Sequence, residues 1–279
     1  ARPTDVTFDS GAGIIGYEIT PQEPAPGDLA VLTVYWQARQ PIGQDYQVFA
    51  HLVDRQGKTW SQFDGPPLHG RHPTTRWQEG EIVRDEYAVH LPESMSTGLY
   101  HFDVGMYALA TMRRASLTGD PSTDAAAIGE VVVRPRTAAW VDTDQPALAT
   151  IGSALALQAY RVDLSAPKPG DQIDLTLVWK ALADPVGDYK VFVHLIDNAE
   201  RIVTQQDSEP LQGRFPTSKW RGGDVVEDRY TLRFPTDVRA GTYRIAIGLY
   251  EPGTGRRLPV SGSTDGRLLI GPLFIGSSG

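Results

Sequence analysis

The strongest constraint on the fold is an internal repeat at an offset of 143 residues, which places Gly170 over Gly27. At this offset GDLAVLTVYWQA aligns with GDQIDLTLVWKA, and DYQVFAHLVD aligns with DYKVFVHLID. LHGRHPTTRW aligns with LQGRFPTSKW, and TGLYHFDVGMY aligns with AGTYRIAIGLY. No gap is needed between Tyr17 and Tyr107, and about a third of the aligned positions are identical. A period of this length matches a whole domain, so the sequence predicts two tandem copies of one domain.

The repeat also sets the expected domain bounds. The chain has 279 residues, which is enough for two domains that each bury a core. We expect the first copy to span 1–135 and the second to span 146–279. Residues 136–145 lie in a polar, proline-containing stretch (RPRTAAWVDTDQP), which is typical of a linker. Trp140 in this stretch is a candidate contact between the domains.

Alternation with a period of two dominates both copies. Leu32, Val34 and Trp36 share one face of a predicted strand, and the pattern returns in the second copy up to Trp179. Short runs of this kind are separated by glycine and proline clusters, and no amphipathic helical pattern competes with them. The sequence therefore predicts an all-β chain of two tandem β-sandwich domains. Immunoglobulin-like and jelly-roll connectivity both remain open.

Composition excludes several classes of function. The net charge of −8 argues against nucleic acid or an anionic membrane surface as the main partner, because both need clustered Lys and Arg. The absence of cysteine removes disulfides, zinc–thiolate sites and cysteine nucleophiles. No apolar run approaches the roughly 20 residues that cross a bilayer, so we expect no membrane insertion by this stretch of chain. No metal or cofactor motif is present, and we expect neither.

The segment from Pro66 to Gly80 lacks alternation and is long for a connection, and long ordered loops are enriched in function. Several polar and aromatic residues in or near this loop are candidates for stacking on and hydrogen bonding to a sugar. The candidate ligand-binding residues are Trp60, Asp64, Arg71, His72 and Trp77. Trp77 also has a simpler interpretation as an anchor for the loop.

A second set of polar residues recurs in both copies and is expected to form a structural network. Asp85 lies on the apolar face of its strand, where an unpaired carboxylate would be very costly. We expect its partners to come from His51, Arg71 and the Trp77 indole. The equivalent residues of the second copy are His194, Arg214, Trp220 and Asp228.

Catalytic interpretations of these residues are weaker. A histidine oriented by a carboxylate needs a nucleophile, and the sequence holds neither a GxSxG motif nor a recurring serine near the histidine. Asp54 precedes a turn, where an aspartate caps the backbone. A glycoside hydrolase with an unrecognised carboxylate pair remains an alternative.

The repeated motifs resemble a known family. The string G-D-x-x-x-L-T-x-x-W, then D-Y-x-V-F-x-H-L-x-D, then G-x-x-P-T-x-x-W-x-x-G-E-x-V-x-D-x-Y resembles a domain of bacterial envelope proteins. It is similar to the extracytoplasmic β-sandwich regions attached to membrane-embedded family 39-type glycosyltransferases, relatives of the dolichyl-phosphate-mannose protein mannosyltransferases. The resemblance covers nearly the whole chain. It implies an extracytoplasmic, bacterial location and carries no catalytic residue onto this sequence.

We therefore expect a non-catalytic, extracytoplasmic module that binds a glycan or an envelope polymer, as an appendage of a membrane glycosyltransferase. The alternative is a structural spacer or a protein–protein interaction module, which would use a sheet edge or an exposed aromatic patch.

Overall fold

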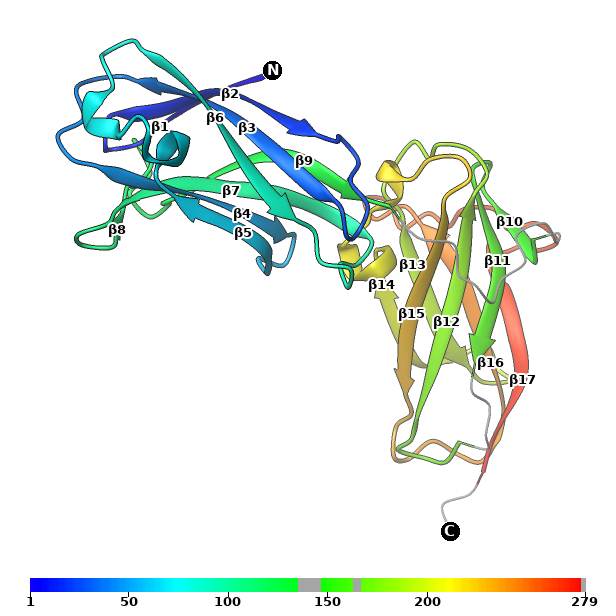
Figure 1. The fold of residues 1–279 in the computed structure, drawn as a ribbon. Helices are drawn as coiled ribbons and strands as arrows, with labels where there is room; N and C mark the ends of the chain where they lie inside the picture. The colour runs from blue at the N-terminus through cyan, green and yellow to red at the C-terminus, as the bar shows by residue number, and fades with distance from the viewer. Residues whose placement is uncertain (135–146, 163–166, 277–279) are drawn as a thin grey trace. The chain divides into compact units, whose positions relative to one another are not determined.

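The computed structural model describes residues 1–134, 147–162 and 167–276 (Figure 1). The chain divides into two compact units, Ala1–Arg134 (unit 1) and Pro135–Gly279 (unit 2). Both consist almost entirely of β-strands, which confirms the predicted fold class. The predicted linker, residues 136–145 with Trp140, lies outside the described residues. Within the described part of the chain, no helix is long and apolar enough to cross a membrane.

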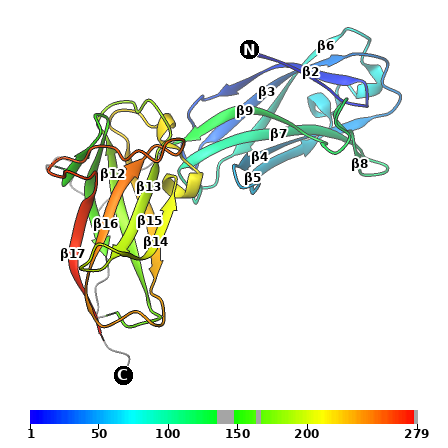
Figure 2. The ribbon, with the colours of Figure 1, turned by 180° about the vertical axis from the view of Figure 1, so that it is seen from behind.

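Unit 1 is a sandwich of two antiparallel sheets, as Figures 1 and 2 show from opposite sides. The first sheet has the order β1-β2-β3-β6, with β1 (Arg2–Thr7), β2 (Ala12–Thr20), β3 (Leu29–Ala38) and β6 (Ile82–His90). The second has the order β5-β4-β7, with β5 (Thr59–Gly65), β4 (Tyr46–Asp54) and β7 (Gly98–Ala108). Both β8 (Arg113–Arg114) and β9 (Ala126–Val133) pair with β7.

Unit 2 repeats this arrangement. One sheet has the order β10-β11-β12-β15, with β10 (Ala149–Ile151), β11 (Leu155–Val162), β12 (Gln172–Ala181) and β15 (Val225–Arg233). The other has the order β14-β13-β16-β17, with β14 (Ile202–Ser208), β13 (Lys190–Ile196), β16 (Gly241–Tyr250) and β17 (Leu268–Ile275).

The strand order resolves the connectivity that the sequence leaves open. In unit 1 the chain crosses between the sheets from β3 to β4, from β5 to β6 and from β6 to β7. In immunoglobulin nomenclature, β2, β3 and β6 of the first sheet correspond to strands A, B and E, and β1 is an additional edge strand. In the second sheet, β9, β7, β4 and β5 correspond to strands G, F, C and C′. The fold is immunoglobulin-like rather than a jelly roll.

A tyrosine corner supports this assignment in each unit. Tyr100 lies near the start of β7, and its hydroxyl donates to the carbonyl of Ser96 at 2.6 Å. Tyr243 in β16 donates in the same way to the carbonyl of Arg239 at 2.7 Å. Such a tyrosine near the start of strand F, which is β7 in unit 1 and β16 in unit 2, is a hallmark of immunoglobulin-like sandwiches.

The alternation of residue types explains how the sheets pack. Every second residue of β6 is buried, beginning with Val83, while the residues between them are exposed. Trp36 and Trp179 are fully buried in the two cores, as predicted. β4 lies between β5 and β7 and is largely buried on both faces, which explains its nearly continuous apolar sequence.

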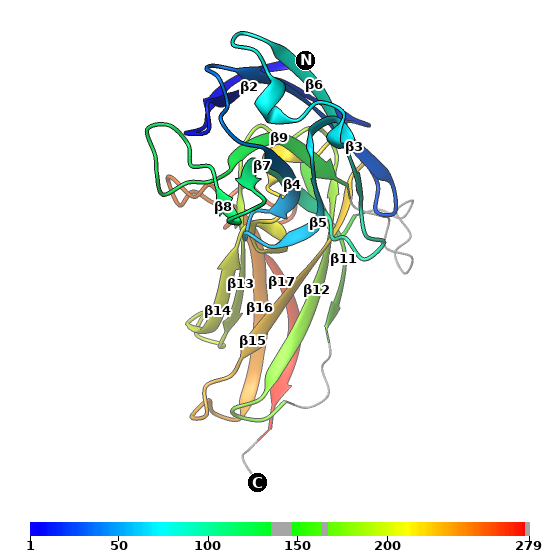
Figure 3. The ribbon, with the colours of Figure 1, turned by 60° about the vertical axis from the view of Figure 1, so that its left-hand side comes forward.

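The Pro66–Gly80 loop forms no strand, as predicted, but it is well defined. It contains two short 3-10 turns, η1 (Pro67–Gly70) and η2 (Thr74–Arg76). The buried Thr74 hydroxyl donates to the carbonyl of Gln44 at 2.9 Å and accepts from the Tyr46 amide. The loop is therefore fixed against the segment that joins β3 to β4, at one end of the sandwich. We call this the loop end of unit 1; it faces the viewer in Figure 3.

Candidate functional site

The buried carboxylate of Asp85 ties the Pro66–Gly80 loop to the core. It accepts hydrogen bonds from the Leu68 amide at 2.9 Å and from the Tyr87 hydroxyl at 2.9 Å. The Tyr87 oxygen in turn accepts from the indole of Trp36 at 2.8 Å. In unit 2 the buried carboxylate of Asp228 accepts the equivalent hydrogen bond from the Leu211 amide. A polar network thus joins loop and sandwich, but its donors differ from those expected.

The expectation that His51, Arg71 or Trp77 donates to Asp85 is wrong. Arg71 donates instead to the carbonyl of Leu68, and the Trp77 indole donates to the carbonyl of His72. Arg214 and Trp220 bond backbone carbonyls of unit 2 in the same way. Asp85 is satisfied by a backbone amide of η1, a turn in which Leu68 and His69 adopt positive φ angles of 49° and 54°.

The two recurring histidines pair with other carboxylates. His51 Nε2 lies 3.3 Å from Asp64, and His194 Nε2 lies 2.9 Å from Asp207. Each histidine ring lies 4.9 Å from a phenylalanine on the same strand. These pairs lie on the outer face of β4 and β13, away from the sandwich core.

An arginine covers that phenylalanine in each unit. The Arg114 guanidinium lies 4.3 Å from the ring centre of Phe49, and Arg257 lies 4.7 Å from Phe192. The far end of the Phe49 ring lies against Gly105, its cross-strand partner in β7. Glycine at this position leaves room for the ring, and the cation–π contact fixes the direction of the guanidinium.

The predicted ligand-binding residues do not gather into one site. The proposal that Trp77 stacks on a ligand is wrong, because its ring is only 3% exposed and packs against Trp36. Trp60 lies at the other end of β5, where its indole donates to the turn aspartate Asp54 at 2.8 Å. His72 pairs with Glu81.

The Asp64 carboxylate pairs with the His51 ring, and the Arg71 guanidinium donates a hydrogen bond to the carbonyl of Leu68. None of the five predicted ligand residues lines either of the two hollows described next.

A hollow of about 700 Å³ opens at the loop end of unit 1. Its walls come from the turn between β1 and β2, the start of the β3–β4 connection and the segment around β8. We call it the arginine hollow, because Arg39, Arg113 and Arg114 line it. The other polar side chains of its lining are those of Thr7, Asp9, Gln40, Ser116 and Thr118.

Each arginine of the hollow has a carboxylate partner. Arg39 lies 2.5 Å from Asp5 and Arg113 lies 3.0 Å from Asp9. Arg114 lies 3.3 Å from Asp124. These pairs are solvent-exposed and so contribute little to stability, about 0–1 kcal/mol each. Each pair uses one guanidinium nitrogen of an arginine that has five N–H donors, so donors remain for a ligand.

The sequence carries a signal for this hollow beyond Tyr107, where the repeat alignment weakens. At the same offset of 143, Arg113 and Arg114 align with Arg256 and Arg257. Arg39 aligns with Leu182, so only unit 1 adds the third arginine. The recurring pair is compatible with a structural role, whereas the third arginine is not required by the fold.

The hairpin that carries these arginines is strained in unit 1. Met112 has a φ of 55°, whereas the equivalent residue of unit 2 is Gly255 with a φ of 69°. We expect Met112→Gly to raise the free energy of unfolding of unit 1 by about 1 kcal/mol, because a side chain disfavours this backbone region. The reverse change, Gly255→Met, should lower stability by a similar amount. Urea unfolding of both variants checks this, and equal effects of the same sign would contradict it.

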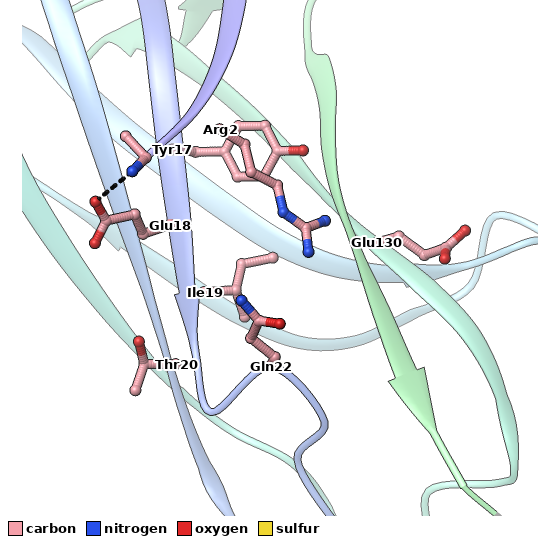
Figure 4. Close-up of a pocket in the computed structure, with 8 residues that line it drawn as sticks. Arg2, Tyr17, Glu18, Ile19, Thr20, Gln22 and Glu130 are labelled. Carbon is pink, nitrogen blue, oxygen red and sulfur yellow. Dashed lines mark ion pairs between the residues drawn. The ribbon is translucent and has the colours of Figure 1, made fainter.

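A second hollow, of about 470 Å³, lies along β2 and is bordered by Glu130 of β9 (Figure 4). Its ion pair joins Glu18 to the amino group of Ala1 at 2.9 Å. Hydrogen bonds from that ammonium and from the Tyr35 hydroxyl lower the pKa of Glu18.

The described residues contain no cluster of side chains that could bind a metal ion. Among residues 1–134, 147–162 and 167–276, no three His, Asp or Glu side chains come together as a possible metal site.

Comparisons with known proteins give no family. No protein-family model and no curated protein matches the chain. Among solved structures, it is similar to the alpha-2-macroglobulin of E. coli in its native conformation, with 10% identity and a TM-score of 0.30. It is also similar to a mutant of Salmonella alpha-2-macroglobulin, with 14% identity and a TM-score of 0.27. Each match covers 96% of this chain but only 14% and 15% of those chains.

Proposed function

We propose that this chain is a non-catalytic, extracytoplasmic accessory module that binds a glycan or an envelope polymer at the arginine hollow. The observation that carries the proposal is the hollow itself. Its volume of about 700 Å³ lies within the range of ligand sites, roughly 300–1,000 Å³. Its lining contains guanidinium and amide donors together with hydroxyl and carboxylate groups. Sugar hydroxyls both donate and accept hydrogen bonds, and such a lining satisfies both roles.

The proposal of a non-catalytic role is supported by the carboxylates. Asp9 is the one carboxylate among the residues that line the arginine hollow, and Arg113 and the Ser116 amide engage it. Glycoside hydrolysis normally needs two carboxyl groups with separate roles. The attachment to a membrane glycosyltransferase is part of the proposal and is supported by the motif resemblance alone.

The hollow can be tested by filling it. Thr118→Trp places an indole in the hollow, and we expect it to abolish binding on an array of neutral and acidic glycans and peptidoglycan fragments. Val186→Trp is the control, because Val186 in unit 2 is 96% exposed and the variant adds an equally exposed indole outside the hollow. An array without hits, or hits that Thr118→Trp leaves intact, would refute the proposal.

A protein-interaction role is the second candidate. It is favoured by Leu109 and Met112, which are 61% and 65% exposed at the tip of the hairpin between β7 and β8. Exposed apolar side chains at a hairpin tip are typical of contact sites. This role predicts that a Leu109→Ser, Met112→Ser variant loses a protein partner and retains any glycan binding.

A further inference from the structure

We infer that the arginine hollow selects an anionic polymer, one that carries carboxylates or phosphodiesters, over a neutral glycan. This inference rests on the proposed function and specifies its ligand. It comes from the charge of the lining, the absence of a stacking surface there, and the fixed direction of Arg114.

The charge of the lining contrasts with that of the chain. Three guanidiniums line the hollow against one carboxylate, that of Asp9, although the whole chain has a net charge of −8. The other two partner carboxylates, Asp5 and Asp124, are not among the lining residues. Each guanidinium is paired with an aspartate, so the local charge is balanced, and the hollow binds an anion through the N–H donors that these pairs leave over.

The lining offers no face for a neutral sugar ring. Phe8 is its one aromatic residue, and its side chain is 1% exposed. Neutral sugars have no charge for a guanidinium to bind, so they depend on apolar ring faces for much of their contact. Leu117 and Pro121 add apolar surface, but no exposed aromatic ring lines the hollow, which offers charge-assisted donors instead.

Arg114 is already oriented for a planar or tetrahedral anion. The central carbon of its guanidinium lies over the Phe49 ring, 4.3 Å from the ring centre, and the far end of that ring lies against Gly105. A guanidinium that lies over a ring still has N–H groups that can form two parallel bonds to a carboxylate or phosphate. Because its direction is fixed before binding, little side-chain entropy is lost.

The experiment measures binding of the whole chain to three probes by isothermal titration calorimetry. The probes are oligogalacturonate, which carries carboxylates, poly(glycerol phosphate), which carries phosphodiesters, and dextran, which is neutral. We expect at least one anionic probe to bind and dextran not to bind. The affinity should fall several-fold between about 50 and 200 mM NaCl, because exposed charges are screened.

Variants then locate the site. Arg113→Ala with Arg114→Ala should weaken anion binding at least about tenfold. The matched control, Arg256→Ala with Arg257→Ala, alters the same hairpin of unit 2 and should leave the affinity unchanged. Arg114→Lys keeps the charge but removes the planar guanidinium that can form two parallel hydrogen bonds. We therefore expect it to weaken binding nearly as much as Arg114→Ala does. Thermal unfolding verifies that each variant is folded.

The outcomes separate this inference from the proposed function. Dextran binding that depends on Arg113 and Arg114 would overturn the anionic preference and leave a glycan site. Anion binding that both double variants reduce equally would overturn the assignment to unit 1. Failure of these three probes, together with an array that has no hits, would overturn the proposed function as well.

Discussion

Lowering the pH from about 7 to about 4 should stabilise unit 2 by about 2 kcal/mol relative to the Asp228→Asn variant. Burial raises the pKa of Asp228 from 3.8 to about 6, although the Tyr230 hydroxyl and the Leu211 amide donate to its carboxylate and oppose the rise. The native state therefore takes up this proton at a higher pH than the unfolded chain does.

The direction of the effect follows from proton binding. Between pH 3.8 and about 6 the native state holds more protons at Asp228 than the unfolded state. The free energy of unfolding consequently falls as the pH rises through this interval, and the contribution is fully present only below pH 3.8. Asparagine keeps a carbonyl oxygen for the Leu211 amide but does not titrate, so the variant lacks this dependence.

Hydrogen exchange of the β12 and β15 amides, corrected for intrinsic rates, reports the stability of unit 2 at each pH. Asp197→Asn is the control of opposite sign. The backbone amide and the guanidinium of Arg201 lower the pKa of Asp197, so its contribution is lost as the pH falls. A difference between parent and Asp228→Asn that stays constant from pH 4 to 7 would contradict the prediction.

The second large effect is expected at the glycines beneath the phenylalanine–arginine stacks. A Cβ atom at Gly105 would lie 2.4 Å from Phe49 Cζ and 2.7 Å from the carbonyl oxygen of Asp124. A Cβ at Gly248 would lie 2.5 Å from Phe192 Cζ and 2.7 Å from a backbone carbonyl. A buried ring and a backbone carbonyl must both shift to admit the methyl group, so each Gly→Ala change should cost about 1–3 kcal/mol.

Thermal or urea unfolding measures these losses against two matched controls. Gly43→Ala and Gly253→Ala place a Cβ where no atom lies within 4 Å, and should change stability by less than about 0.5 kcal/mol. In a Phe49→Leu background the cost of Gly105→Ala should shrink, because one of its two clashes is removed. If Gly105→Ala is as mild as Gly43→Ala, the ring does not rest on the glycine as described.

The repeat and its alternation were enough to predict the all-β sandwich and the buried faces of the strands, because a period of two determines which side chains face a core. The long loop was also recognisable, from its prolines and missing alternation. The partners of Asp85 were not, because the decisive donor is the backbone amide of Leu68. That amide belongs to a turn in which Leu68 and His69 have positive φ angles, which their residue types do not indicate.

The arginine hollow was missed for a different reason. Its walls come from parts of the chain far apart in sequence: Arg113 pairs with Asp9, 104 residues away. The predicted site instead grouped residues that are neighbours in sequence around one loop. Successive residues of a strand point to opposite faces. Trp60 lies at the start of β5, whereas Trp77 follows η2 and is buried against Trp36, so nearness in sequence did not bring the side chains together.

The construction of the hollow from separate connections has an evolutionary consequence. The turn between β1 and β2, the β3–β4 connection and the segment around β8 each supply one wall. Of the arginines, Arg39 comes from the β3–β4 connection, and Arg113 and Arg114 come from the two-residue strand β8. A duplicated gene segment can therefore diverge in what it recognises by replacing single connections, while the inherited scaffold continues to fold. Leu182 in place of Arg39 is one such divergence between the two halves of this chain.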